Sequence, residues 1–504
     1  MTLHDDAAWR ALTTRDARFD GRLFVGVTST GIYCRPVCRV RTPRRENCRF
    51  FGNAAQAESQ GFRPCLRCRP ELAPGLSLTD SSGVLAQQAA RILEQAAHEG
   101  EDPPLANIAA RLGVTDRHLR RIFGQMHGVT PIDYLTTQRL LLAKHLLTDT
   151  ALPVTQVALS VGFASVRRFN AAFAERYRMS PTALRRNRDG AASDAAHAPP
   201  ALRLAWRPPY DVDGVLGFFA QRAVEGIEAV DGLTLRRTLG LEHRGRALAG
   251  WVEMRFEPRR HEVRVQVAPQ LAPAWGLVVQ RVRQCLDLDA EPQQIDTALA
   301  GMPGRTQPGV RVPSGLDGFE IAVRVILGQQ VTLAAARTLT RRLVLRFGAP
   351  IETPWPELDR LFPTAQAVAA AKPHEIGELG VVRQRVRALQ ALAAEVAAGR
   401  LQLHRAAPLE PTLASLQALP GIGPWSAQLI AMRALAWPDA WPASDIGVLQ
   451  ALDTRDPREA TARAEPWRPW RAYAVMRLWL PSTDTAAAAP TAPAADPEPT
   501  VIRS

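Results

Sequence analysis

Leu419-Pro-Gly-Ile-Gly-Pro-Trp-Ser-Ala427 is the stretch that decides the fold of the C-terminal half. Gly421 and Gly423 allow a tight backbone turn, and Pro424 suits the first position of a helix that follows the turn. The free N–H groups at the start of that helix would face a phosphate of DNA. The stretch therefore predicts a helix-hairpin-helix that binds DNA without reading its sequence.

Asp445 lies 22 residues beyond Gly423. A hairpin alone predicts DNA binding and nothing more, and an aspartate in a loop is commonly a solvated surface residue. The two features together, however, resemble the helix-hairpin-helix DNA glycosylase superfamily, and specifically the AlkA-type 3-methyladenine glycosylases. Further segments that carry this resemblance are residues 319–332, residues 470–479 and the motif Pro208-Pro-Tyr-Asp211.

The resemblance implies a catalytic role for Asp445. Its carboxylate would stabilise the positive charge that develops on deoxyribose as the base departs, and it would orient the attacking water. Trp425 and Trp479 match pocket aromatics that stack on an extruded base, and packing in the hydrophobic core is the alternative for both. The DNA contacts expected in this half are Gly421, Gly423 and Gln330.

Residues that differ from the relatives refine this expectation. Related bifunctional glycosylases have a lysine nucleophile at the position of Trp425, so the resemblance implies a monofunctional enzyme that forms no Schiff base. No cysteine follows the hairpin, which excludes the iron–sulfur cluster of some relatives. Leu429 stands in place of a pocket tyrosine, and Gln330 stands in place of the leucine that inserts into the duplex.

Four of the six cysteines form two pairs, Cys34 with Cys38 and Cys65 with Cys68. These spacings suit four thiolate ligands of one tetrahedral zinc ion, and we expect zinc as the cofactor, with no organic cofactor. Cys48 lacks a paired neighbour and is expected to be a small core residue. Four ordinary buried thiols and a purely structural zinc site are the alternatives.

The sequence around these cysteines resembles the metal-binding domain of the Ada adaptive-response regulators, notably in Thr30-Gly-Ile-Tyr-Cys34 and Gly61-Phe-Arg-Pro-Cys65. The resemblance implies that Cys34 takes a methyl group irreversibly from a methyl phosphotriester in DNA. Zinc would keep the sulfur deprotonated at neutral pH, and methylation would reduce the negative charge of the cluster, as in a sensor switch. The basic residues expected to hold the DNA backbone are Arg35, Arg39, Arg63, Arg67 and Arg69.

Two helix-turn-helix units are predicted between the cysteine-rich segment and the C-terminal half. One turns at Gly113 and begins its second helix at an N-cap, Thr115, and the other repeats the pattern with Gly162 and Ser165. The segment 132–147 between them is predicted to be helical. The pattern resembles the AraC-type DNA-binding domain, which implies two recognition helices in successive major grooves, and a plain helical bundle is the alternative. The candidate DNA contacts are Arg117, Arg121, Arg167 and Arg168.

The charge of the chain favours a polyanionic partner. Lys and Arg number 62 against 49 Asp and Glu, which gives a formal net charge of +13. Residues 1–190 hold 27 basic and 17 acidic side chains, so +10 of the +13 lies there and +3 remains for residues 191–504. With no membrane-length apolar segment and no basic signal-peptide start, we expect a cytoplasmic, nucleoid-associated protein without a membrane partner.

The predicted fold class is multidomain and mainly α-helical. It combines a small zinc α+β domain, a double helix-turn-helix domain, an α+β subdomain with alternating strands at 251–256 and 262–267, and an all-α helix-hairpin-helix glycosylase domain. In order, the expected boundaries are 1–76, 83–188, a linker at 189–200, 201–311, 312–480 and a disordered tail at 481–504.

These expectations combine into a DNA alkylation repair protein. Its C-terminal half would hydrolyse the N-glycosidic bond of alkylated bases such as 3-methyladenine, and its N-terminal half would demethylate phosphotriesters and regulate transcription. The expected partners are double-stranded DNA with alkylated bases, promoter DNA and RNA polymerase. The alternative is an alkylation-responsive transcription regulator whose hairpin domain only binds DNA.

Overall fold

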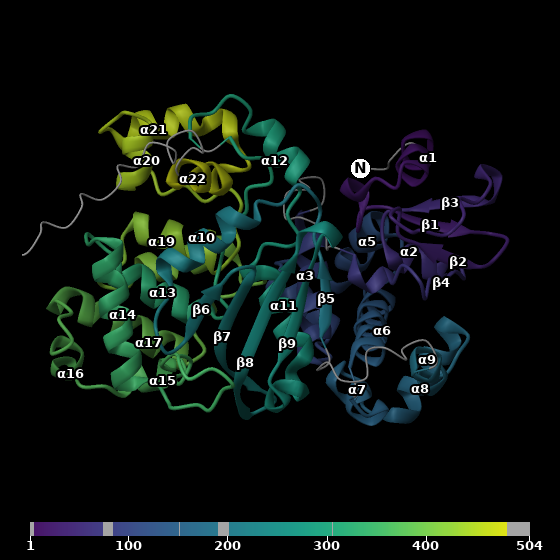
Figure 1. The fold of residues 1–504 in the computed structure, drawn as a ribbon, viewed down its shortest axis with the longest axis horizontal. Coiled ribbons are helices and arrows are strands. Elements are labelled where there is room, and N and C mark those ends of the chain that lie inside the picture. Colours follow the sequence, from purple (N-terminus) through teal and green to yellow (C-terminus); the bar gives the residue numbers. More distant parts are fainter. Residues whose placement is uncertain (1–4, 74–83, 151, 190–200, 305, 481–504) are drawn as a thin grey trace, which may run out of the picture.

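The computed structural model describes residues 5–73, 84–150, 152–189, 201–304 and 306–480, which form four consecutive units (Figure 1). The expected multidomain, mainly helical fold class is confirmed. The predicted tail and all but the first residue of the predicted linker lie outside the described residues, and that first residue, Asp189, instead ends a helix. No helix in the described part of the chain is both long and apolar enough to cross a membrane.

A small sheet organises the N-terminal unit, with strands in the order β3-β1-β2-β4. Antiparallel pairing of β1 with β2 sets Cys34, the last residue of β2, opposite Val25. Cys48, which we expected in the core, is half-buried at the start of β3. The elements are α1 (Asp5–Thr13), β1 (Phe24–Val27), β2 (Ile32–Cys34), β3 (Cys48–Phe51), α2 (Ala54–Ser59) and β4 (Arg63–Pro64).

The second unit contains the two predicted helix-turn-helix units. Gly113 and Gly162 have φ of +68° and +87°, a left-handed conformation that favours glycine. Thr115 and Ser165 cap the helices that follow, because each hydroxyl accepts the backbone N–H three residues ahead. The helices are α3 (Val84–Glu99), α4 (Leu105–Arg111), α5 (Asp116–His127), α6 (Pro131–Asp149), α7 (Val154–Ser160), α8 (Val166–Tyr177) and α9 (Pro181–Asp189).

The third unit is built on a five-stranded antiparallel sheet in the order β5-β9-β8-β7-β6. Both predicted strands are present, within β8 and β9, and their alternating apolar side chains pack against helices. The elements are β5 (Leu202–Ala205), α10 (Val212–Arg222), β6 (Glu228–Asp231), β7 (Thr234–His243), β8 (Arg246–Glu257), β9 (Glu262–Val267), α11 (Trp275–Cys285) and α12 (Pro292–Ala298).

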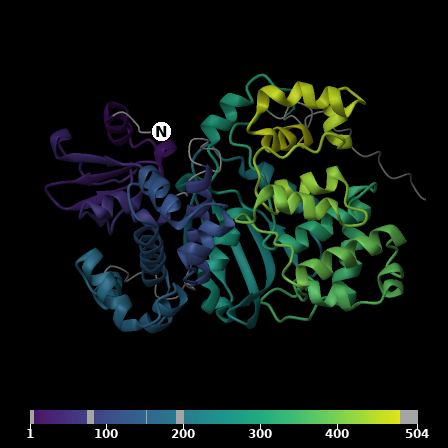
Figure 2. The same cartoon turned by 180° about the vertical axis from the view of Figure 1, so that it is seen from behind.

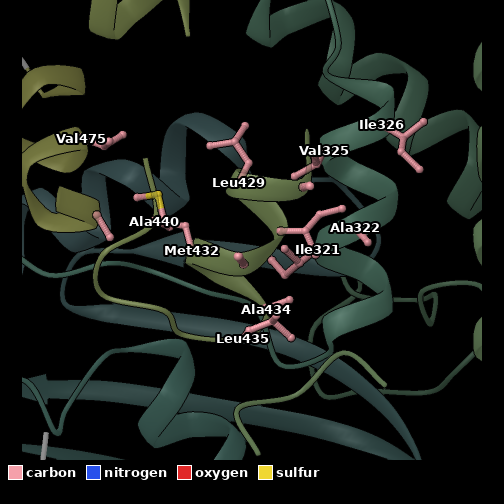
Figure 3. Close-up of a cluster of buried hydrophobic side chains, with 14 of the residues drawn as sticks. Ile321, Ala322, Val325, Ile326, Leu429, Met432, Ala434, Leu435, Ala440 and Val475 are labelled. Atoms are coloured by element: carbon pink, nitrogen blue, oxygen red, sulfur yellow. The ribbon is translucent and has the colours of Figure 1, made fainter. Parts of the chain in front are cut away.

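The fourth unit is helical and packs around α13 and α19. Figure 3 shows Ile321 and Val325 of α13 beside Leu429 and Met432 of α19, within one large apolar core. The helices are α13 (Gly318–Leu327), α14 (Leu333–Phe347), α15 (Ala365–Ala370), α16 (Pro373–Gly377), α17 (Arg383–Ala397), α18 (Leu409–Gln417), α19 (Pro424–Arg433), α20 (Ile446–Ala451), α21 (Pro457–Ala464) and α22 (Arg471–Trp479).

The large sheet separates the other units. Figures 1 and 2 show the two N-terminal units on one side of it and the C-terminal helices on the other. Helix α3 packs on α11, and Arg244 at the β7–β8 turn donates hydrogen bonds to the carbonyls of Gly100 (2.8 Å) and Leu159 (2.9 Å). The second unit, which contains both helix-turn-helix units, is therefore fixed to the sheet unit by both apolar and polar contacts.

Candidate active site and metal centre

The hairpin joins α18 to α19. Gly421 has φ +78°, and a Cβ there would lie 3.1 Å from the Cβ of Ala388, so this position requires glycine. Gly423 differs from our expectation, because its extended backbone (φ −86°) is open to any residue. A Cβ at Gly423 would meet no atom within 4 Å, so glycine here leaves open surface in front of the α19 N-terminus, which begins at Pro424.

The loop after α13 is tied to this hairpin. The side-chain amide of Gln329 donates to the carbonyl of Gly421 (2.9 Å) and to the hydroxyl of Ser426 (2.8 Å). Gln330, the next residue, is exposed and has φ +51°. The sequence did not predict these two hydrogen bonds of Gln329, which hold Gln330 beside the hairpin.

The carboxylate of Asp445 accepts three hydrogen bonds. The indole N–H of Trp479 lies 2.8 Å from Oδ1, the indole N–H of Trp425 lies 3.0 Å from Oδ2, and the backbone N–H of Val448 lies 3.1 Å from Oδ1. Asp445 is also the N-cap of α20, and only 8% of it is exposed. The arrangement holds a buried carboxylate in one orientation.

A carboxylate offers about four acceptor positions, two on each oxygen. Oδ1 uses both of its positions, whereas Oδ2 uses one. Oδ2 is therefore the atom that keeps an acceptor position for a ligand. Gly447 makes this geometry possible, since a Cβ there would lie 3.1 Å from the Trp479 ring and 3.2 Å from Oδ1 of Asp445.

Asp445 and both tryptophans line one cavity of about 700 Å³. This volume is within the range of small-molecule sites. Val325 and Leu429 contribute apolar surface, while four arginines lie along other parts of the wall. Leu429, which we expected to replace a pocket tyrosine, is buried and contributes an apolar side chain to this part of the wall. The cavity wall also includes Arg222, Arg324, Arg337 and Arg433.

The four paired cysteines form one cluster, in which the Sγ atoms all lie within 4.8 Å of one another. Four zinc–sulfur bonds of about 2.3 Å place tetrahedral sulfurs roughly 3.8 Å apart, so the cluster fits one zinc ion. Cys34, Cys38 and Cys65 are buried and Cys68 is half-buried. The backbone N–H of Arg35 also points to Cys68 Sγ, at 3.4 Å.

Two of the arginines expected to hold DNA point inward instead. Arg35 is buried, with its Nε 2.8 Å from Oδ1 of Asp20. The backbone carbonyl of Asp20 in turn accepts from Arg207 of the sheet unit at 2.9 Å. The expectation that Arg35 binds phosphate is therefore wrong, because its guanidinium is buried and bonded to Asp20 within the same unit.

Arg69 is buried in the same way. Its side chain pairs with Glu71 at 2.8 Å and with Asp149 at the end of α6. Lys144 of α6 also pairs with Glu71. Sequence alone could not show this, because the carboxylate of Asp149 belongs to the next unit of the chain.

The remaining predicted DNA contacts lie on the surface. Arg39 and Arg67 are exposed beside the cysteine cluster, and Arg63 is half-buried. The basic side chains on α5 and α8 are likewise exposed, each within the first two turns of its helix, where an AraC-type domain would read DNA. These exposed residues are Arg117, Arg121, Arg167 and Arg168.

Four family models match consecutive parts of the chain. They are the metal binding domain of Ada (residues 7–71), a helix-turn-helix domain (108–187), the AlkA N-terminal domain (201–317) and the HhH-GPD superfamily base excision DNA repair proteins (323–468). The metal-binding match coincides with the unit that holds the four cysteines. The last match contains Asp445 and Trp425.

One curated relative matches nearly the whole chain. The probable bifunctional transcriptional activator/DNA repair enzyme AlkA of Mycobacterium tuberculosis is 37% identical over 95% of this chain and 97% of its own length. The chain belongs to the family of bifunctional transcriptional activator/DNA repair AlkA proteins. This assignment places the zinc cluster, both helix-turn-helix units and the Asp445 cavity in one family architecture.

Two other relatives each match only part of this AlkA-family chain. DNA-3-methyladenine glycosylase 2 of Escherichia coli is 35% identical over 55% of this chain and 95% of its own length. The bifunctional transcriptional activator/DNA repair enzyme Ada of Escherichia coli is 39% identical over 26% of this chain and 34% of its own length.

The first prediction concerns the indole of Trp479. Trp479→Phe keeps an aromatic ring and removes the N–H bond to Asp445 Oδ1, and a hydrogen bond to a charged group is worth about 1.5–3 kcal/mol. We expect the rate of any reaction that uses Asp445 to fall roughly 10- to 100-fold in single-turnover assays. Trp355→Phe, at a ring packed on Trp251 away from the cavity, is the matched control. Equal rates in both variants would contradict the positioning role.

Proposed function

We propose that this protein is a monofunctional DNA glycosylase of the 3-methyladenine type, with Asp445 as its catalytic residue. The observation that carries the proposal is the buried carboxylate, which two indole N–H groups orient at the wall of a cavity beside the DNA-binding hairpin. An extruded base would enter the cavity, with Gly421, Gly423 and the α19 N-terminus against the backbone and Gln330 filling the gap in the duplex.

The reaction follows from this geometry. The bond between C1′ and the base nitrogen breaks, the electron pair leaves with the base, and positive charge develops on the sugar. The negative charge of Asp445, whose side chain is buried at the cavity wall, stabilises that sugar. The free acceptor position on Oδ2 takes a proton from water as the water oxygen bonds to C1′.

Trp425 and Trp479 have two tasks in this proposal. Their N–H groups fix Asp445, and their ring faces can attract the positive charge of an alkylated purine. The position of Trp425 also supports a monofunctional reaction, since an indole cannot form a Schiff base.

The N-terminal unit is proposed to accept methyl groups on Cys34 from methyl phosphotriesters. A bound zinc ion would keep the cysteine sulfurs deprotonated. The Cys34 sulfur forms a bond to the methyl carbon while the methyl–oxygen bond breaks, and the electron pair stays on the phosphate, which becomes an ordinary diester. The exposed side chain of Arg67 lies close in sequence to ligands Cys65 and Cys68, where it can contact the DNA backbone.

The helix-turn-helix unit is proposed to bind promoter DNA and to contact RNA polymerase as a transcription activator. Exposed arginines on α5 and α8 support the DNA contact, because each helix presents them near its N-terminal end. The proposed cellular site is the nucleoid. The proposed DNA contacts on the two helices are Arg117, Arg121, Arg167 and Arg168.

The direct test of the glycosylase is Asp445→Asn. The substitution removes the negative charge and turns one oxygen into an N–H donor that faces an indole N–H, so we expect no measurable release of 3-methyladenine from alkylated DNA. Binding to the same duplex should persist, because the hairpin is unchanged. Asp453→Asn, on an exposed side chain, should keep wild-type release. If Asp445→Asn released 3-methyladenine at the wild-type rate, the result would favour a transcription regulator whose hairpin domain only binds DNA.

The test of the methyl acceptor is mass spectrometry of the intact protein after incubation with methyl phosphotriester DNA. We expect one added methyl group, located on Cys34 by peptide mapping, and none after Cys34→Ser. Cys48→Ser, at a thiol outside the cluster, should still gain the methyl group. Retention of zinc with no methyl uptake would show that the site is purely structural.

A further inference from the structure

A groove of about 750 Å³ lies between the two helix-turn-helix units. Most of its described lining residues come from helices α3 to α8, but one, Arg244, comes from the β7–β8 turn of the sheet unit. The lining also includes Arg120 of α5 and Arg168 of α8, so the groove runs from one proposed recognition helix to the other. The sheet unit therefore contributes a side chain to a surface that otherwise belongs to the second unit.

Backbone contacts fix Arg244 at this groove. Its Nη2 donates to the carbonyls of Gly100 and Leu159, at 2.8 and 2.9 Å. A Cβ at Gly100 would overlap this Nη2, so glycine leaves the room that the guanidinium needs. An arginine has five N–H donors, and the described residues supply no acceptor for those on Nε and Nη1 of Arg244. Because the side chain is exposed, these donors remain for a ligand.

The groove is positively charged. Four arginines and one carboxylate, that of Asp102, lie among the described residues that line it. Arg139 pairs with Asp102 at 3.4 Å, and Arg120 pairs with a carboxylate of its own helix at 3.1 Å. Among the described residues, no carboxylate forms an ion pair with Arg168 or Arg244. Two uncompensated guanidinium groups, one from α8 and one from the sheet unit, therefore line the same groove.

The geometry of DNA gives this charge a partner. An AraC-type domain would place its recognition helices in successive major grooves, which lie one helical turn of about 34–36 Å apart. The phosphates of the DNA segment between these two major grooves would face the protein between α5 and α8, where the groove runs. Guanidinium groups with available N–H donors bind phosphate well. The groove is therefore suited to a DNA backbone.

We propose that Arg244 binds a DNA phosphate between the two major grooves, so that the sheet unit of the glycosylase half is part of the promoter-binding surface. This inference rests on the proposed binding of promoter DNA by the second unit. The two carbonyl contacts hold the guanidinium in place before DNA arrives, which lowers the entropic cost of ordering it on binding.

The groove also exposes two apolar side chains, Ile132 and Leu159, which would suit a segment of a protein partner. DNA is the favoured occupant because the groove is continuous with a proposed recognition helix. Arg168, which lines the groove, is itself a proposed DNA contact, and Arg244 carries the same charge beside it.

The test measures the affinity of the full-length protein for an undamaged duplex at several salt concentrations. The wild-type protein first selects this duplex from a random-sequence library, which reports on the helix-turn-helix units because the hairpin does not read sequence. Each phosphate contact that is lost lowers the slope of log affinity against log salt by about 0.9.

For Arg244→Gln we expect the loss of about one phosphate contact from this slope and binding at least about threefold weaker at one fixed salt concentration. Arg244→Lys keeps the positive charge and should keep most of the slope, although it loses the fork that holds two carbonyls. Arg259→Gln, at an exposed residue beyond the other end of β8, is the matched control and should bind like the wild type.

A second variant removes a repulsive charge and leaves the contacts of Arg244 in place. Glu242 is exposed near the end of β7, two residues before Arg244. Two residues of extended chain span about 7 Å, which is less than a Debye length of roughly 10 Å. Glu242→Gln should therefore bind the selected duplex about two- to threefold more tightly.

The outcomes separate phosphate binding from a merely structural role of Arg244. Equal weakening by Arg244→Gln and Arg244→Lys with an unchanged salt slope would overturn the inference. If Arg168→Gln weakened binding and Arg244→Gln did not, the inference would also fail, with promoter binding intact and the groove left to a protein partner. If the wild-type protein selected no sequence, or if Arg168→Gln bound the selected duplex like the wild type, the proposed function of the second unit would fail instead.

Discussion

Three N–H groups hold the carboxylate of Asp445 in a place that water reaches poorly. A buried carboxylate without such donors would lose its charge or its orientation, and both are needed to stabilise a cationic sugar. The donors come from α19, α20 and α22, so the site exists only when these helices pack correctly. The apolar contact of α13 with α19 in Figure 3 supports that packing and lines the same cavity.

Polar contacts join the N-terminal unit to the helix-turn-helix unit and to the sheet unit. They are made by arginines that lie next to the cysteine ligands in the sequence. Arg35 links this unit to the sheet through Asp20 and Arg207, and Arg69 links it to α6 through Asp149. Buried ion pairs of this kind contribute specificity of docking more surely than net stability. The cluster therefore lies at a structural junction of three units, while Arg39 and Arg67 remain exposed toward solvent.

Local signals were readable from sequence, and long-range partners were not. The turns at Gly113 and Gly162 and the caps at Thr115 and Ser165 follow from short-range backbone rules, and the cysteine spacing follows from ligand geometry. The indole of Trp479 reaches Asp445 across 34 residues of sequence. Arg35 pairs with the carboxylate of Asp20, and no local sequence pattern indicates that pairing. Gly423 resembled a turn residue, yet its backbone is extended.

The central claim is that Asp445 stabilises positive charge on the sugar. The most direct measurement is the affinity for two duplexes at one fixed salt concentration, one with a protonated pyrrolidine in place of the sugar and one with an uncharged tetrahydrofuran. The account predicts that the wild-type protein binds the cationic duplex at least about tenfold more tightly and that Asp445→Asn loses this preference while it binds the neutral duplex equally well. Equal affinity of the wild type for both duplexes, or a preference that survives the substitution, would contradict it.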